Sequence, residues 1–128
     1  MNTDDPKVAL ALDFHGALAK RDWGALEGLV TEDATWSLPG ENAVSGRAIG
    51  RDEVVARARK LAGYGVRFDL RHVLVGRDNV ALSLHNTGHR EGVVLDEQVA
   101  IVCRLRDSRI AGIETYLSDV AGMNAFFV

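Results

Sequence analysis

The 128-residue sequence contains one cysteine and no apolar run near the roughly 20 residues that a membrane-spanning helix needs. A single cysteine cannot form an intramolecular disulfide or a cysteine-based zinc site. The glycines show no phosphate-loop pattern, so nothing favours nucleotide binding. No repeat or linker is visible, and the N-terminal MNTDDPK lacks the apolar core of a signal peptide. We expect one soluble, cytoplasmic domain over residues 1–128, with no cofactor, metal or membrane partner.

The overall composition is that of an ordinary globular domain. Hydrophobic residues make up 47% of the chain, charged residues make up 26%, and the formal net charge is −3. A disordered chain would be poorer in apolar residues and more one-sided in charge. A chain of this length can bury one real core.

Charge is unevenly distributed along the chain. Between Arg47 and Arg77 lie eight basic and three acidic residues, a local net charge of +5, which leaves −8 for the remainder. A nucleic-acid surface would need aromatic residues or a known motif among these charges, and only Tyr64 and Phe68 lie there. We therefore interpret the segment as a solvated face and expect no nucleic-acid partner.

The first part of the chain favours helices. Apolar residues recur at helical spacing after Asp5 and Pro6, which suit a capped helix start. Asp22 is a candidate N-cap for a second helix over residues 23–30, and residues 52–61 predict a third helix.

Strand signals follow a different spacing. ATWSL at 34–38 alternates like a strand and stops at Pro39-Gly40, and residues 41–50 are predicted as a loop. From Val66 onward alternation predicts four hairpin-linked strands, and Ser118 or Asp119 can cap a terminal helix. The four predicted strands cover residues 66–75, 80–90, 93–106 and 109–117.

Three helices with one strand among them, followed by four strands, give an α+β plan. A curved antiparallel sheet wrapped round three N-terminal helices would form a cone with an apolar hollow between the layers. Hollows of this kind are where small ligands usually bind.

Several segments together resemble one known superfamily. They are RDWGALEGLVTEDATWSLPG, GRAIGRDEVVARARKL, RLRDSRIAGIETYLSD and the terminal NAFF. Nearly the whole chain resembles the nuclear transport factor 2-like superfamily, with its cystatin-like cone, and within it the SnoaL-like and ketosteroid-isomerase-like proteins. The resemblance implies the fold more than the activity, because the superfamily includes isomerases, cyclases, epoxide hydrolases, dehydratases, transport proteins and scaffolds.

The resemblance allows the ketosteroid isomerase chemistry to be checked. That mechanism uses a general-base Asp and an oxyanion hole made of a Tyr and a protonated Asp. In an ungapped pairing, Phe14 stands at the Tyr position, Leu38 at the base position and Ile101 at the second Asp position. Because all three polar groups are absent, we expect no steroid isomerisation by that mechanism.

Two other arrangements in the superfamily are harder to place on this chain. An epoxide hydrolase like that acting on limonene needs an Asp-Arg-Asp cluster, for which Arg90, Glu97 and Glu114 are possible parts. SnoaL-like cyclases rely on an Asp and a His in the cavity, and the sequence does not indicate which residues would form that pair.

The same pairing predicts which strand residues face the cavity. Most are apolar, and Asn86, Arg90 and Glu97 are the exceptions. The predicted cavity-facing residues are Leu84, Asn86, Gly88, Arg90, Glu97, Val99, Ile101, Cys103, Ile113, Thr115 and Leu117. An inward Glu97 would have a raised pKa and could act as a general base. The alternative, which we favour, is a cross-strand ion pair between Arg90 and Glu97 at the cavity rim.

The histidines divide between the two faces. His15, at the edge of the first helix's apolar stripe, could reach the cavity as an acid or base, or be a satisfied residue at the core edge. His72 shares the Phe68 face by parity, an assignment that one β-bulge would reverse. His85 and His89 lie on the opposite face, where their spacing could suit a metal but nothing else supplies ligands.

These arguments define the candidate site. The candidate acid/base residues are Glu97, His15 and His72. Trp36 is expected to form cavity wall and to stack on a planar ligand, and Cys103 is expected to be a small hydrophobe rather than a nucleophile. The candidate substrate-binding residues are Phe14, Trp36, Leu38, Phe68, Asn86, Arg90, Ile101, Cys103 and Thr115.

Two functional hypotheses follow. The chain is either a cofactor-independent isomerase, cyclase or hydrolase acting on a small hydrophobic metabolite, or a non-catalytic module for ligand binding or dimerisation. The resemblance also implies a homodimer through the outer face of the sheet. Apolar residues on both faces support that expectation, namely Val73, Val75, Val80, Leu82 and Val102.

Overall fold

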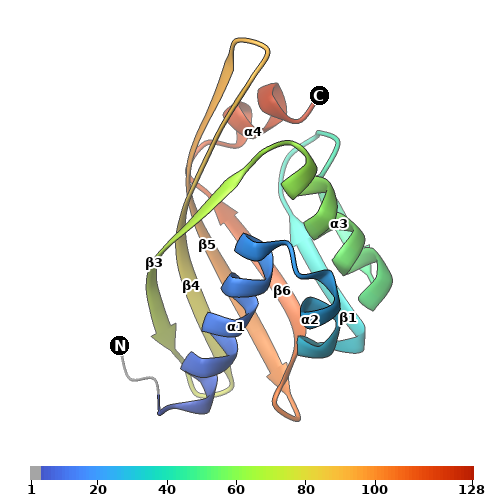
Figure 1. The fold of residues 1–128 in the computed structure, drawn as a ribbon, viewed down its shortest axis with the longest axis vertical. Coiled ribbons are helices and arrows are strands. Elements are labelled where there is room, and N and C mark those ends of the chain that lie inside the picture. The colour runs from blue at the N-terminus through green and yellow to red at the C-terminus, as the bar shows by residue number, and fades with distance from the viewer. Residues whose placement is uncertain (1–3) are drawn as a thin grey trace.

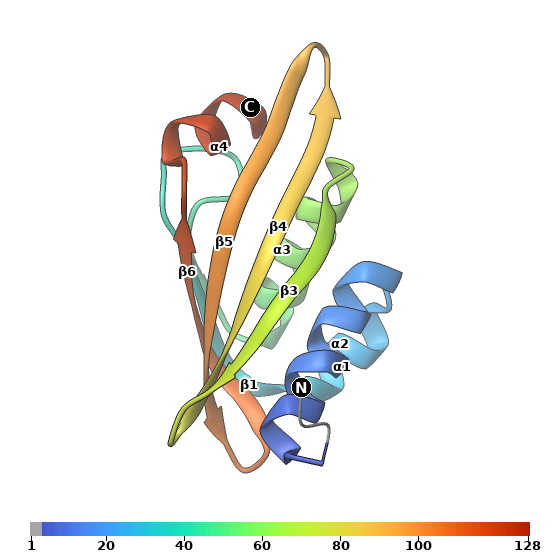
Figure 2. The ribbon, with the colours of Figure 1, turned by 90° about the vertical axis from the view of Figure 1, so that its left-hand side faces the viewer.

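The computed structural model describes residues 4–128 and places three helices against one side of a six-stranded sheet (Figures 1 and 2). The elements in chain order are α1 (Pro6–Lys20), α2 (Trp23–Leu29), β1 (Val30–Leu38), β2 (Gly46–Ile49), α3 (Arg51–Gly63), β3 (Arg67–Val75), β4 (Asn79–Arg90), β5 (Val93–Arg106), β6 (Arg109–Leu117) and α4 (Val120–Phe126). Within residues 4–128, no helix combines the length and the apolar character needed to cross a bilayer.

Aspartate side chains begin three of the helices, as predicted. The Asp5 carboxylate accepts a hydrogen bond from the Lys7 backbone N–H at 2.8 Å, and Pro6 occupies the first turn of α1. Asp22 caps α2 and Asp119 caps α4 in the same way. Each cap satisfies a backbone donor that the helix itself leaves unpaired.

The sheet follows the predicted hairpins, with two additions. Its strand order is β2-β1-β6-β5-β4-β3, and β3 to β6 pair antiparallel in succession. β1 begins at Val30, earlier than predicted, and runs parallel to β6. The prediction of a loop over 41–50 was wrong in part, because residues 46–49 pair with Thr35–Leu38 as β2. That pairing is a tertiary contact that the short, glycine-flanked segment does not encode locally.

A register shift in β3 corrects the prediction for His72. Phe68 pairs with Asn86 and Leu70 with Leu84, but His72 then pairs with Ser83 instead of continuing the alternation. The extra residue turns His72 to the outer face of the sheet, where it is exposed.

The same shift exchanges the two residues that follow. Strict alternation from Phe68 and Leu70 would place Leu74 inward, but Leu74 is 62% exposed, whereas Val73 packs against the core. Parity counted from Val66 was therefore right only as far as Leu70.

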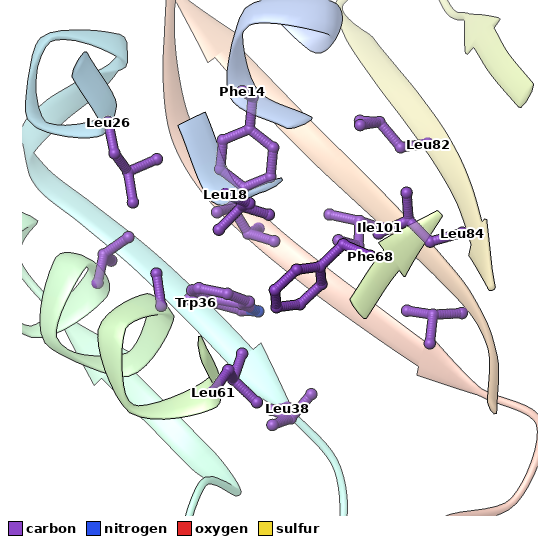
Figure 3. Close-up of a cluster of buried hydrophobic side chains, with 14 of the residues drawn as sticks. Phe14, Leu18, Leu26, Trp36, Leu38, Leu61, Phe68, Leu82, Leu84 and Ile101 are labelled. Atoms are coloured by element: carbon purple, nitrogen blue, oxygen red, sulfur yellow. The ribbon is translucent and has the colours of Figure 1, made fainter. Parts of the chain in front are cut away.

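The hydrophobic core lies between the helices and the inner face of the sheet. Figure 3 shows Phe14 of α1, Trp36 of β1 and Phe68 of β3 projecting toward one another, with Leu82 and Ile101 from β4 and β5 beside them. This face of β4, β5 and β6, which the helices cover, is called the interior face below. The α+β architecture with a curved sheet is the one that the sequence predicted.

Candidate functional site

Glu97 and Asn86 face each other on the interior face of the sheet. They are directly paired across β4 and β5. Alternate residues of β5 are buried, and Glu97, with 1% of its surface exposed, falls in that buried series between Leu95 and Val99. The alternation therefore carries a carboxyl group into an otherwise apolar layer.

The two oxygens of Glu97 have different surroundings. Oε1 accepts a hydrogen bond from the backbone N–H of Asp119 at 3.0 Å. Oε2 is buried without a partner among the described residues, and so is Oδ1 of the facing Asn86. Buried acceptors are paired in the great majority of cases, so two adjacent unpaired acceptors are an unusual feature. We call Glu97 Oε2 and Asn86 Oδ1 the acceptor pair.

Burial raises the pKa of the Glu97 carboxyl above its ordinary value, and the negative charge of Asp119 acts in the same direction. The hydrogen bond from the Asp119 N–H opposes this effect but is the smaller influence. Desolvation penalises the charged form of a carboxyl group, so the protonated acid is favoured. A carboxyl in this state can deliver or accept a proton closer to neutral pH than an exposed glutamate can.

The terminal helix α4 covers this end of the interior face. A Cβ on Gly122 would lie 3.4 Å from Glu97 Oε2, and a Cβ on Gly88 would lie 2.9 Å from the ring of Phe126. The absence of a side chain at Gly88 thus allows α4 to approach the sheet closely beside the acceptor pair.

Arg90 is placed differently from the prediction. Its guanidinium lies 4.5 Å from the centre of the Tyr64 ring and donates to the Phe126 carbonyl at 3.3 Å. In the β4–β5 register Arg90 faces Val93, whereas Glu97 faces Asn86 four residues further along the strand. The prediction of an Arg90–Glu97 ion pair was therefore wrong. Arg90 instead holds the end of α4 through its hydrogen bond to the Phe126 carbonyl.

Trp36 is a buried wall of the interior with its polar atom satisfied. The indole Nε1–H donates to Thr115 Oγ1 at 2.8 Å, and the Arg57 guanidinium lies 5.6 Å from the ring centre. The three residues that the ungapped pairing of the sequence matches to the ketosteroid isomerase set are all buried, namely Phe14, Leu38 and Ile101. The places expected for that catalytic set therefore hold core side chains.

His15 is half-buried and its ring is engaged. Nε2 lies 2.6 Å from the Phe68 carbonyl oxygen. Because a carbonyl oxygen only accepts, Nε2 must carry the proton. The structure thus places His15 at the core edge with a backbone partner, as in the alternative given for it above.

On the outer face of the sheet, a row of three polar side chains is linked by contacts, namely Arg71, His85 and Asp96. His85 contacts Asp96 through Nε2 at 2.5 Å and Arg71 through Nδ1 at 3.0 Å. A guanidinium only donates, so Nδ1 accepts and the Nε2–H donates to Asp96. Both ring nitrogens are therefore occupied, and residues 4–128 contain no group of three or more His, Cys, Asp or Glu residues placed to hold a metal ion.

The acidic and basic residues considered for an epoxide hydrolase arrangement do not converge. Glu114 is exposed on the outer face of β6, whereas Glu97 lies on the interior face and Arg90 stacks on Tyr64. The sheet therefore separates Glu114 from Glu97.

Cys103 is fully buried, and burial raises the pKa of its thiol to about 12. Since the thiolate is the nucleophilic form, this side chain stays protonated at neutral pH. The interpretation of Cys103 as a small hydrophobe is consistent with its position.

Five surface pockets have volumes of about 280 to 480 Å³, and none of these five is lined by Glu97 or Asn86. The largest is lined by His85, His89 and Asp96 among others. The hollow inside the cone stays a prediction.

Sequence reasoning missed the part that α4 plays at this site. Asp119 was recognised as a helix cap, but its N–H also holds Glu97. A signal that could have found it is Gly88 in a strand, whose missing side chain permits the close packing of Phe126 of α4.

A sequence profile of the SnoaL-like domain matches residues 11–113. The chain belongs to the SnoaL-like domain family. An uncharacterised protein of Mycobacterium tuberculosis is 27% identical to this SnoaL-like protein over 129 residues, which cover 98% of each chain. The family assignment agrees with the resemblance found in the sequence.

Solved structures share the whole fold. Bal32a, from a soil-derived mobile gene cassette, superimposes with a TM-score of 0.92 at 25% identity over 99% of this chain and 100% of its own. TerC, co-crystallised with polyporic acid, gives a TM-score of 0.80 at 17% identity over 95% and 98% of the two chains. Other chains of the fold are described as cystatin-like, as NTF2-like, or as a candidate ketosteroid isomerase or polyketide cyclase. Below 25% identity these likenesses show the fold alone.

Proposed function

We propose that this SnoaL-like protein binds a small hydrophobic molecule between the helices and the interior face, and that Glu97 exchanges a proton with it. The observation that carries the proposal is the unpaired Glu97 Oε2 in a side chain with 1% exposure. A buried carboxyl group without a full set of partners costs free energy. Its raised pKa suits it to general acid or base chemistry.

The surrounding residues suggest how a ligand would be held. Trp36 and Phe68 supply aromatic surface on which a planar molecule can stack, and Asn86 offers an oxygen that orients a polar group. The activity would be that of an isomerase, cyclase or hydrolase that works without the Tyr and Asp set of ketosteroid isomerase. The co-crystal of TerC with polyporic acid supports ligand binding by this fold.

A thermal-shift screen with steroid-like, terpenoid and polyketide-like compounds tests the proposal. Some compounds are expected to raise the melting temperature of the wild-type protein, and those that are turned over should lose at least tenfold in rate in Glu97→Gln. Glu114→Gln, on the outer face, serves as the matched control and should leave both results unchanged. If no compound stabilises the wild-type protein, the proposed function is wrong.

A non-catalytic module is the second candidate, favoured by the anchoring of α4. Glu97 Oε1 already accepts from the Asp119 N–H, so the side chain has a structural role whether or not a ligand binds. In this case compounds would stabilise the wild-type protein and Glu97→Gln equally, and no turnover would be found.

For partners and location we propose a homodimer formed through the outer face of the sheet, in the cytoplasm. Support for the dimer comes from exposed apolar side chains on that face, Leu74, Val94 and Tyr116. Three residues named for it in the sequence analysis do not contribute, because Val80 and Leu82 are buried on the interior face and Val73 packs against the core.

A further inference from the structure

We propose that the acceptor pair makes this protein selective for neutral ligands that carry a hydroxyl or N–H donor on a hydrophobic body, and that ligands with a carboxylate are rejected. The inference rests on the proposed function, since it names the ligand class for the same interior site. It is carried by two buried oxygen atoms that have no partner among residues 4–128, Asn86 Oδ1 and Glu97 Oε2.

The two acceptors act as a unit because the strand register fixes them. Asn86 and Glu97 are direct cross-strand partners, so their Cβ atoms lie within roughly 5.5 Å of each other on one face. Glu97 is also held through Oε1 by the Asp119 N–H, which limits how far Oε2 can move to find another partner. One polar group of a ligand can therefore reach both atoms.

The chemistry of the pair decides which polar group fits. An amide oxygen accepts only, whereas a protonated carboxyl group can both donate and accept. A hydroxyl can donate to Asn86 Oδ1 and still accept from Glu97, so it satisfies both. A pure hydrocarbon would leave both acceptors unpaired, and this omission is costly inside a protein.

A ligand carboxylate, unlike a hydroxyl, has no hydrogen to donate to the acceptor pair. It would present lone pairs to Asn86 Oδ1 and bring a charge into an apolar layer. Two guanidinium groups of the interior are already engaged, since Arg57 donates to the Trp36 carbonyl and Arg90 donates to the Phe126 carbonyl. A ligand carboxylate would have to displace one of these hydrogen bonds to gain a charged partner.

Three probes of matched size test the selection by isothermal titration calorimetry: 2-naphthol, 2-methylnaphthalene and 2-naphthoate. The wild-type protein is expected to bind 2-naphthol about tenfold more tightly than 2-methylnaphthalene, the factor that one well-made hydrogen bond supplies. 2-Naphthoate should bind most weakly of the three.

Single substitutions test whether the acceptor pair causes this ligand preference. Asn86→Leu should reduce the preference for 2-naphthol over 2-methylnaphthalene to below about threefold. Thr87→Val, the adjacent residue on the outer face, is the control and should keep the full preference.

The outcomes separate the two proposals. If the hydrocarbon or the carboxylate binds as tightly as 2-naphthol, or if Asn86→Leu keeps the preference, the ligand class is wrong although interior binding stands. If none of the three probes binds, and the wider compound screen also fails, the proposed function falls with it.

Discussion

At the scale of single residues, the chemistry of this protein depends on one side chain with two unequal oxygens. Glu97 Oε1 is held by a backbone N–H, which fixes the carboxyl group, while Oε2 has no partner within residues 4–128. A purely structural anchor would not need to be ionisable, because an amide oxygen could accept the same hydrogen bond. Comparing wild type with Glu97→Gln therefore separates the effect of the ionisable carboxyl group from the effect of the hydrogen bond that Oε1 accepts.

The pH dependence of the free energy of unfolding should reveal the protonation of the Glu97 carboxyl group. Burial raises the Glu97 pKa, so the folded state keeps its proton where the unfolded chain has lost it, and stability falls as pH rises through this range. Glu97→Gln cannot ionise and should escape that fall. We expect the free energy of unfolding of Glu97→Gln, relative to wild type, to increase as the pH rises above the ordinary pKa range of glutamate.

Urea titrations at several pH values measure this difference. Glu114→Gln, which changes an exposed carboxyl on the outer face, is the control. A difference between Glu97→Gln and wild type that stays constant with pH would show that the carboxyl is not perturbed.

Residue-scale features were predictable wherever strict alternation held. The pairing with the resembled superfamily predicted that Glu97 and Asn86 face the cavity, and both lie on the interior face. Alternation failed at His72, because one additional residue in β3 reverses every later side chain. It also could not reveal that Asp119, 22 positions from Glu97 along the chain, would supply its hydrogen bond.

At the scale of elements, the position of α4 depends on glycine in the strand beneath it. Gly88 of β4 leaves room for the Phe126 ring, whereas Gly16 in α1 has open space around its Cβ position. The two glycines have opposite effects, since one permits close packing and the other only weakens a helix.

Alanine substitutions should separate these effects. Gly16→Ala is expected to stabilise the protein by about 0.5 to 1 kcal/mol, because alanine loses less entropy in a helix. Gly88→Ala should destabilise it by about 1 to 3 kcal/mol, because the new methyl group would lie 2.9 Å from Phe126. Urea unfolding measures both, and a Gly88→Ala variant as stable as wild type would contradict the close packing of α4.

Most elements were predictable because their boundaries are marked locally. Asp5, Asp22 and Asp119 cap the helices predicted after them, and the turns at 76–79 and 91–92 separate antiparallel strands. β2 was missed because a four-residue strand bounded by glycines is stabilised by its pairing with β1 and not by its own sequence.

At the scale of the whole molecule, the sheet offers a second apolar surface outside the core. Leu74 and Tyr116 are 62% and 57% exposed on the outer face, with Ala81, Ala100 and Val102 on the strands between them. An exposed apolar patch on a small domain marks a contact surface, and a second copy of the chain is the proposed occupant.

Sedimentation velocity tests that dimer. The wild-type protein is expected to sediment as a dimer at micromolar concentration, and the double substitution Leu74→Lys with Tyr116→Lys should make it a folded monomer. Ala19→Lys, an exposed change on α1, is the control and should remain dimeric. A monomeric wild type at these concentrations would overturn the proposal.

The match to the SnoaL-like sequence profile assigns this chain to a family, while its chemistry must come from its own interior residues. The positions that pair with the ketosteroid isomerase set are apolar, and the one buried carboxyl group in the described core belongs to Glu97. The central claim is therefore that this carboxyl group faces a bound ligand.

Carbon-13 NMR of the labelled Glu97 carboxyl, titrated with pH in the presence and absence of 2-naphthol, tests that claim most directly. We predict a midpoint above the ordinary range for glutamate that moves when 2-naphthol is added, while the Glu114 signal does not respond to the ligand. An ordinary midpoint for Glu97, unchanged by the ligand, would contradict the account.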